Sequence, residues 1–187
     1  MRKATPINEE IELDPKRYIV SRTNEKGIIT FANPYFCKIS GYTESELLGQ
    51  PHNIVRHPDM PRIIFKIMWE RIKEGKNFIA VVKNMAKDGR YYWIMTDFEP
   101  KISPLTNSIT GYTAYRKAAP RKAIEIITPI YDKLLNIEAN DGMKGSEEAL
   151  LDILAKKKMN YDEFVDDITE NRGVIKSFFA AMKKAFE

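Results

Sequence analysis

The sequence has little cysteine: Cys37 is the only one among 187 residues. An internal disulfide is thereby excluded, and a lone thiol fits a reducing cytoplasm. Long hydrophobic runs are also lacking, since no apolar segment reaches the roughly 20 residues that a membrane-spanning helix needs. The N-terminus has no apolar signal-peptide core. We therefore expect a soluble cytoplasmic protein that is recruited to the inner membrane only by a partner, without inserting itself.

Blocks of like charge are absent as well. The net charge is +4, with 30 basic and 26 acidic residues mixed along most of the chain. A protein that tracks phosphates usually shows a basic stripe with aromatic residues set into it, so we do not expect nucleic-acid binding. The chain also lacks a Ser-His-Asp set, metal-ligand spacing and a phosphate-cradling glycine loop. These gaps argue against an enzyme.

What the sequence does contain is a polar corner, residues 53–61 (Asn-Ile-Val-Arg-His-Pro-Asp-Met-Pro). Proline fixes its own φ and disfavours the helical region for the residue before it. The two prolines therefore hold the polar groups of Arg56, His57 and Asp59 in set directions. Such a corner between apolar, helix-like segments indicates a polar ligand. The alternative is a surface loop with a weak ion pair between Arg56 and Asp59, and composition alone leaves both open.

Five segments have the β-branched and aromatic residues, and in part the period of two, that are typical of strands. They are residues 18–20, 28–31, 78–85, 91–98 and 109–117. The turn before the second segment contains Gly27, which takes a positive φ at little cost, and Asp-Gly at 88–89 marks a second hairpin. In the last segment Gly111 permits close packing.

Helix signals lie between the second and third of these segments. Asn33 followed by Pro34 predicts a short helix that ends near Gly41. Thr43 and Glu46 form a capping box for another helix, and a longer helix follows the corner. Two strands, several short helices and three strands predict an α+β domain. We expect a five-stranded sheet with sequential antiparallel pairing, helices on one side, and a pocket between them.

The chain divides into three parts. Residues 1–16 form an N-terminal arm that orders only where it docks, residues 17–119 form the sensor domain, and residues 120–187 form a helical region. The helices of this last region each have one apolar stripe, which must be buried against something. We expect the region to serve docking or dimerisation.

Local signals divide the C-terminal region into separate helices. We expect the first to break at residues 141–145, the next to be capped by Ser146, and a third to start at a capping box of Asn160 and Glu163. The last helix, residues 174–186, sets three phenylalanines opposite lysines. Packing in the core or against a partner is favoured there, and a membrane surface is the alternative.

Several short motifs resemble the FAD-binding PAS domains of bacterial aerotaxis (Aer-type) receptors. They are Phe31-Ala32-Asn33, Ser40-Gly41-Tyr42-Thr43, Gly49-Gln50-Pro51-His52-Asn53, residues 55–61 of the corner, Met68-Trp69, Val82-Lys83-Asn84 and Tyr92-Trp93. The resemblance covers about residues 15–118 and implies a PAS fold. It implies a redox and energy sensor that binds FAD non-covalently and relays the flavin's state to a membrane-bound chemotaxis-type receptor. Because the remaining residues have no membrane segment and no HAMP-type linker, the chain resembles the soluble half of a split energy-taxis system, and homodimerisation is a further expectation.

The resemblance assigns FAD-binding positions to Arg56, His57 and Asp59, and we include the neighbouring Asn53. A guanidinium fork suits the pyrophosphate oxygens. Asp59 would accept hydrogen bonds from hydroxyl groups or orient Arg56. His57 near a phosphate would favour its charged form, or would pack as a neutral ring.

One strand face carries the other expected flavin contacts. With period two, Phe78, Ala80, Val82 and Asn84 share a face, and Lys83 points outward. The carboxamide of Asn84 in an apolar row needs a partner, which flavin N5 and O4 would supply; a cross-strand hydrogen bond is the alternative. Phe78 stands where the family often has Trp.

Two further residues complete the expected cofactor-binding set. We expect Trp69 to cover the flavin ring in part and to pack in the core in part. Asn33 is first a helix cap, with ligand contact as its second role.

Three alternatives remain open at this point. Haem would need an axial histidine, and only His52 and His57 exist. A ligand-free PAS module would act as a scaffold through the C-terminal helices, and a small flavin reductase would need a nicotinamide site for which there is no fingerprint. Light-sensing flavin PAS domains place a reactive cysteine in the helix beside the ring. Cys37 lies on an earlier helix, so we expect no covalent photoadduct.

Overall fold

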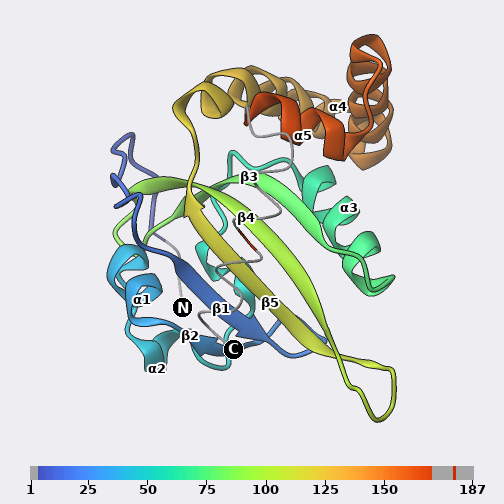
Figure 1. Cartoon of the computed structure of the whole chain (residues 1–187). Helices are drawn as coiled ribbons and strands as arrows, with labels where there is room; N and C mark the ends of the chain where they lie inside the picture. Colours follow the sequence, from blue (N-terminus) through green and yellow to red (C-terminus); the bar gives the residue numbers. More distant parts are fainter. Residues whose placement is uncertain (1–3, 170–178, 180–187) are drawn as a thin grey trace.

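The computed structural model describes residues 4–169 and Phe179. Its elements, in chain order, are β1 (Ile19–Thr23), β2 (Ile29–Ala32), α1 (Pro34–Ser40), α2 (Glu44–Leu47), the 3-10 helix η1 (His52–Val55), α3 (Arg62–Lys73), β3 (Phe78–Met85), β4 (Tyr91–Ile102), β5 (Ile109–Ala118), α4 (Arg121–Lys157) and α5 (Tyr161–Ile168). In Figure 1 the strands form one twisted sheet, with α1 and α2 near one end and α3, α4 and α5 toward the other.

The sheet has five antiparallel strands in the order β2-β1-β5-β4-β3. The predicted fold class is confirmed, but the pairing is not sequential throughout. β1 pairs with β5, so that Ile19 lies opposite Arg116 and Thr23 opposite Tyr112. The helices between β2 and β3 carry the chain from one sheet edge to the other. Gly111 is required at the β1–β5 contact, because a Cβ there would collide with the carbonyl oxygen of Thr23.

Three of the helix caps predicted from the sequence are confirmed. The Asn33 side chain accepts a hydrogen bond from the Phe36 amide (3.0 Å) at the start of α1. Capping boxes are present at Thr43 and Glu46 before α2, and at Asn160 and Glu163 before α5. These signals are read within one turn of helix, so they do not depend on the tertiary fold.

The described part of the N-terminal arm docks on the β3–β4 hairpin. The amide of Ile7 donates to the Gly89 carbonyl (3.0 Å) and that of Ile11 to the Tyr91 carbonyl (2.7 Å). Leu13 is buried in the core. These contacts hold the described part of the arm against the sheet and the core.

The C-terminal helices pack on the same chain. The buried side chains of α4 before its kink are Ala123, Ile127, Tyr131, Leu134 and Glu138. The Tyr131 hydroxyl donates to the Val81 carbonyl of β3 (2.7 Å). In α5, Tyr161 stacks on Phe78 with ring centroids 4.9 Å apart, and Asp162 binds Arg71 of α3 through two hydrogen bonds of 2.7 Å. The two helices thus form a layer against α3 and β3.

Of the two expectations for the middle of this region, the break is confirmed and the Ser146 cap is wrong. The backbone is non-helical at Gly142 (φ 71°, ψ -167°), so α4 consists of two helical segments that meet at a kink, and the second segment runs on to Lys157. Ser146 therefore lies inside the helix, fully buried, and its hydroxyl makes no hydrogen bond among the described residues. Local cap chemistry was outweighed there by burial of the following apolar stripe.

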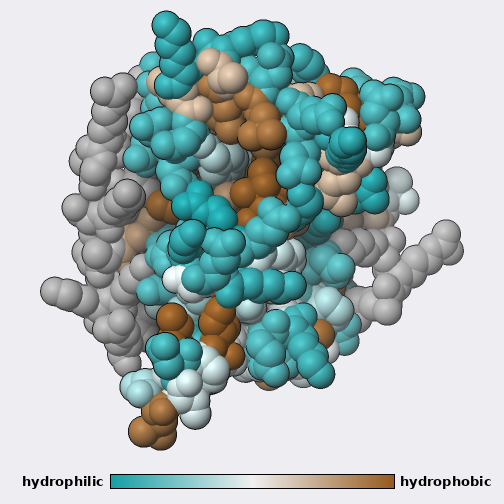
Figure 2. Space-filling model, turned by 90° about the vertical axis from the view of Figure 1, so that its right-hand side faces the viewer, coloured by the Kyte–Doolittle hydropathy of each residue, from teal (hydrophilic) through white to brown (hydrophobic). Residues whose placement is uncertain are grey.

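The last predicted helix, residues 174–186, lies outside the described residues except for Phe179, which is buried against Val20, Met95 and Tyr115. Within the described part of the chain no helix is long and apolar enough to cross a membrane. Figure 2 shows a largely hydrophilic face with a few hydrophobic patches. Among the described residues the most exposed large apolar side chain is Leu105, 94% exposed in the β4–β5 turn.

Candidate functional site

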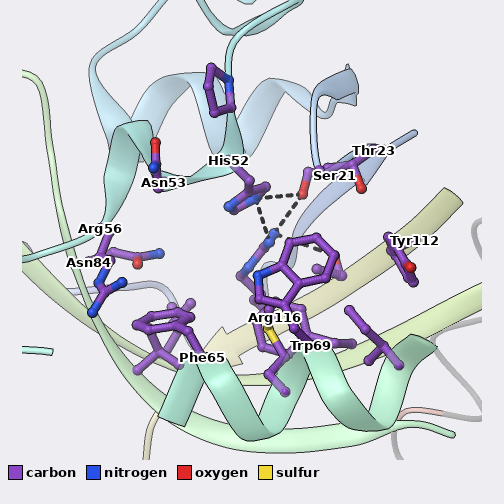
Figure 3. Close-up of a pocket in the computed structure, with 18 of the residues that line it drawn as sticks. Ser21, Thr23, His52, Asn53, Arg56, Phe65, Trp69, Asn84, Tyr112 and Arg116 are labelled. Atoms are coloured by element: carbon purple, nitrogen blue, oxygen red, sulfur yellow. Dashed lines mark hydrogen bonds between the residues drawn. The ribbon is translucent and has the colours of Figure 1, made fainter. Parts of the chain in front are cut away.

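A cavity of about 250 Å³ lies between the inner face of the sheet and the segment from η1 to α3. The strands contribute Ser21, Thr23, Val82, Asn84, Ile94, Phe98, Tyr112, Ala114 and Arg116. The opposite wall contains Lys26, Gly27, Pro51, His52, Asn53, Arg56, Phe65, Met68, Trp69 and Ile72. Figure 3 shows these side chains converging from both sides. A mostly apolar slot with a few convergent polar groups suits a flat organic ligand.

The polar groups on the sheet side form one cluster. Arg116 of β5 donates to the Ser21 hydroxyl of β1 (3.0 Å) and lies 2.7 Å from Nε2 of His52. Ser21 and His52 are themselves 3.0 Å apart. Figure 3 draws this triangle at the cavity. Three segments far apart in sequence therefore supply one polar floor.

Arg116 is a buried cation whose partners are neutral. Its side chain is 1% exposed, and its described partners are Ser21, the Ala114 carbonyl, His52 and two aromatic rings. No carboxylate among the described residues pairs with it. Burial lowers the pKa of Arg116 to about 10, which still leaves the group charged at neutral pH. An uncompensated buried charge beside a cavity calls for an anionic or acceptor-rich ligand.

His52 is held neutral by the same surroundings. Burial, and then the Arg116 charge, lower its pKa to about 3. Since Arg116 approaches Nε2 as a donor, that nitrogen serves as the acceptor. The ring also stacks on Phe36 with centroids 5.9 Å apart.

This shift predicts an acid sensitivity of the ligand-free fold. Below the ordinary His52 pKa of 6.5 the unfolded chain binds a proton that the folded protein does not, so stability falls as the pH drops from 6.5 toward 3. Between pH 7 and pH 5 we expect a loss of about 2 kcal/mol that His52→Gln removes. Urea unfolding of both proteins at the two pH values measures it. An equal loss in the two proteins would contradict this assignment.

The opposite wall is built around Trp69. Its ring meets Tyr112 edge-on, with centroids 5.4 Å apart. Gly27, at φ +77°, lies under the indole, and a Cβ there would be 3.0 Å from the ring. Glycine at this turn therefore leaves room for the tryptophan that closes the cavity.

A family model described as PAS fold matches residues 29–104, which include the corner and most of the cavity wall. This part of the chain has the PAS fold. The aerotaxis receptor of Escherichia coli K12 is 40% identical over 130 residues, which is 70% of this chain and 24% of that receptor. The nitrogen fixation regulatory protein of Klebsiella pneumoniae is 32% identical over 85 residues, 46% of this chain and 17% of that protein. The match thus spans about a quarter or less of these relatives.

Solved structures agree on the fold. A light-oxygen-voltage domain studied with a flavin analogue superposes with a TM-score of 0.52 at 16% identity, covering 62% of this chain and 86% of that one. An RNA-binding light-oxygen-voltage receptor gives a TM-score of 0.50 at 15% identity, covering 66% of this chain and 34% of that one. At such low identity the likeness concerns the architecture of the PAS domain.

The predicted site residues fall into three groups. Four line the cavity of the PAS domain: Asn53, Arg56, Trp69 and Asn84. His57, 3% exposed, lines a second cavity beside the first. Asp59, Phe78 and Asn33 line neither.

The three residues outside both cavities have other partners. Asp59 pairs with Lys83 (2.6 Å) and lies 3.4 Å from His57. Phe78 packs on α5, and the Asn33 side chain caps α1 while also bonding the backbone of β1 and the residue before it. Lys83 is correspondingly not a freely solvated lysine, since its side chain is only 15% exposed. The ligand contacts predicted for these residues stay predictions.

Sequence reasoning did not assign a ligand-binding role to the polar floor. Arg116 follows Tyr112 and Ala114 at period two on the inner face of β5, so a charged residue in that alternation was a usable signal. His52 belongs to a motif that resembled the family, yet it was considered only as a haem ligand.

Proposed function

We propose that this PAS domain is a redox sensor that binds a flavin, FAD, non-covalently and reports its state to a signalling partner. The observation that carries the proposal is Arg116, a fully buried cation at the cavity that has no acidic partner among the described residues. The imide edge of a flavin presents carbonyl oxygens, and reduction adds negative charge to the ring. Arg116 would donate hydrogen bonds to the carbonyl oxygens and would stabilise the negative charge of the reduced ring.

The other walls suit the rest of the ring system. Phe65, Met68 and Trp69 of α3 and Val82 of β3 offer apolar surface. Asn84 on β3 offers a carboxamide that can donate or accept, which is what a ring nitrogen needs when it gains a proton on reduction. The flavin supplies the electron chemistry, and these residues bind and orient it. We therefore propose a sensor and not an enzyme.

The similarity to the aerotaxis receptor supports the proposed pathway. We propose that the chain is the soluble, cytoplasmic component of a split energy-taxis system. Its partner in that system would be a membrane-bound chemotaxis-type receptor. A homodimer is part of the same proposal. A difference in affinity for the receptor between the two redox states is what would transmit the signal.

Haem is less well supported as the ligand. An axial histidine needs a ring nitrogen that is available to the iron. In the first cavity His52 has Nε2 occupied by Arg116 (2.7 Å) and Ser21 (3.0 Å). His57 accepts a hydrogen bond from the Asp59 amide at Nδ1 (3.1 Å) and lines only the second cavity.

Purification of the chain tests the proposal directly. We expect a yellow protein with an absorption band at about 450 nm, and an extract that contains FAD. FMN in the extract would change the assigned cofactor from FAD to FMN, and a haem spectrum would show that the ligand is haem. A colourless protein that takes up neither FAD nor FMN would leave the scaffold alternative.

A further inference from the structure

A second cavity of about 590 Å³ adjoins the first. The two share Asn53 and Arg56 as lining residues. The second cavity is lined by the PAS domain, by Ala4 and Pro6 of the N-terminal arm, and by α4 through Leu135, Glu138 and Ala139. The C-terminal helical region is therefore part of a cavity that opens next to the proposed flavin slot.

Arg56 stands at the junction. Its guanidinium lies over the Phe65 ring, 4.2 Å from the centroid, and donates to the Met60 carbonyl (2.9 Å). The stacking fixes the plane of the guanidinium, and a fixed fork suits phosphate oxygens. Arg62 adds a second cation to the same cavity.

Glu138 of α4 adds a carboxylate to the cavity that Arg56 and Arg62 line. It is 8% exposed and accepts hydrogen bonds from the Arg62 amide (2.9 Å) and the Ile63 amide (2.8 Å) at the start of α3. Its carboxylate also lies 3.5 Å from the Arg62 guanidinium. Pro61, at the cap position of α3, makes no side-chain cap hydrogen bond, so Glu138 performs that function from 75 residues away.

The carboxylate also acts on Arg56. Burial lowers the pKa of Arg56, and the Glu138 charge works in the opposite direction and stabilises the cation. Glu138 is thus an internal anion for both arginines of the cavity.

We propose that the second cavity takes the phosphate groups of the ligand against Arg56, and that Glu138 competes with them for the same positive charge. This inference rests on the proposed function, since it assumes a flavin nucleotide whose ring occupies the first cavity. A bound pyrophosphate neutralises Arg56 and repels Glu138. It thereby weakens the Glu138 cap of α3 and loosens α4 on the PAS domain. Ligand occupancy is in this way connected to the region that would meet a partner.

The test compares FAD with riboflavin, which has the ring but no phosphate. In Glu138→Gln we expect FAD to bind about fivefold to tenfold more tightly, because a competing charge is gone, while riboflavin affinity stays within about twofold. Arg56→Gln should weaken FAD selectively, and adding Glu138→Gln to it should then bring no gain. Fluorescence quenching of each flavin by the full chain gives the dissociation constants.

A matched control is Glu147→Gln. Glu147 is also on α4 and binds Lys66 of α3 (2.7 Å), yet it lines neither cavity. This variant makes the same charge change and should alter the FAD-to-riboflavin ratio by less than about twofold.

A second measurement needs no variant. In the wild-type chain, amide hydrogen exchange across residues 131–139 should be faster with FAD bound than with riboflavin bound, if the phosphates displace Glu138. Equal exchange in the two complexes, or an unchanged FAD-to-riboflavin ratio in Glu138→Gln, would overturn the inference while leaving flavin binding intact. A protein that binds neither flavin would overturn the proposed function and this inference together.

Discussion

Replacing Arg116 by methionine is expected to stabilise the ligand-free protein by about 1–3 kcal/mol while reducing flavin affinity about 100-fold. The stability gain arises because a fully buried cation without an acidic partner is removed. Ser21 and His52 remain 3.0 Å apart and can still bond to each other. The affinity loss arises because the imide edge of the ring loses its charged donor. Flavin that still binds at high concentration should show a midpoint potential on the order of 50 mV lower.

Urea unfolding and flavin titration measure the two effects on one preparation. Lys117→Met is the matched control, because Lys117 is the next residue on β5, is half-buried, and lines neither cavity. Its loss should leave flavin affinity within about twofold. If the Arg116 variant were less stable and bound flavin normally, the cation would be a structural group and the main support for flavin binding would be lost.

The contrast between these residues and the helix caps shows what the sequence allows one to predict. A cap such as Asn33 or Thr43 satisfies its partner within three residues, so the local pattern contains the whole interaction. The period of two along β3 likewise placed Val82 and Asn84 at one cavity. Elements whose physics is local were therefore predicted, and the family's corner motif led to Arg56 and Asn53.

The polar floor formed by Arg116, Ser21 and His52 depends on long-range contacts and could not be predicted from local patterns. Arg116 meets Ser21 across 95 residues and His52 across 64. The first contact follows from the pairing of β5 with β1, and the second also needs η1 to lie against these strands. The sequential pairing that we expected would have kept these strands apart. The same holds for Glu138, whose role at α3 depends on how α4 folds back. Long-range pairing is a property of the whole chain, and no window of the sequence contains it.

The second large effect concerns Asn84, one of two carboxamides at the first cavity, with Asn53. We expect Asn84→Ala to keep the flavin but to abolish the difference between oxidised and reduced protein in hydrogen exchange along β3 and α4. The reason is the position of Asn84 on the strand that α4 contacts. Asn84 lies on β3, the strand whose Val81 carbonyl accepts the Tyr131 hydroxyl of α4 (2.7 Å). A carboxamide that rotates when its flavin partner changes from acceptor to donor would move the strand that α4 contacts.

Asn53→Ala provides the comparison, since it removes the same group from η1, which lines the second cavity together with α4. That variant should weaken flavin binding about tenfold and retain the exchange difference between redox states. Hydrogen exchange on both variants, each saturated with flavin and each measured oxidised and reduced, separates binding from relay. A redox-dependent difference that survives in Asn84→Ala and disappears in Asn53→Ala would move the relay from the sheet to the corner, and with it the place where a receptor would detect the flavin's state.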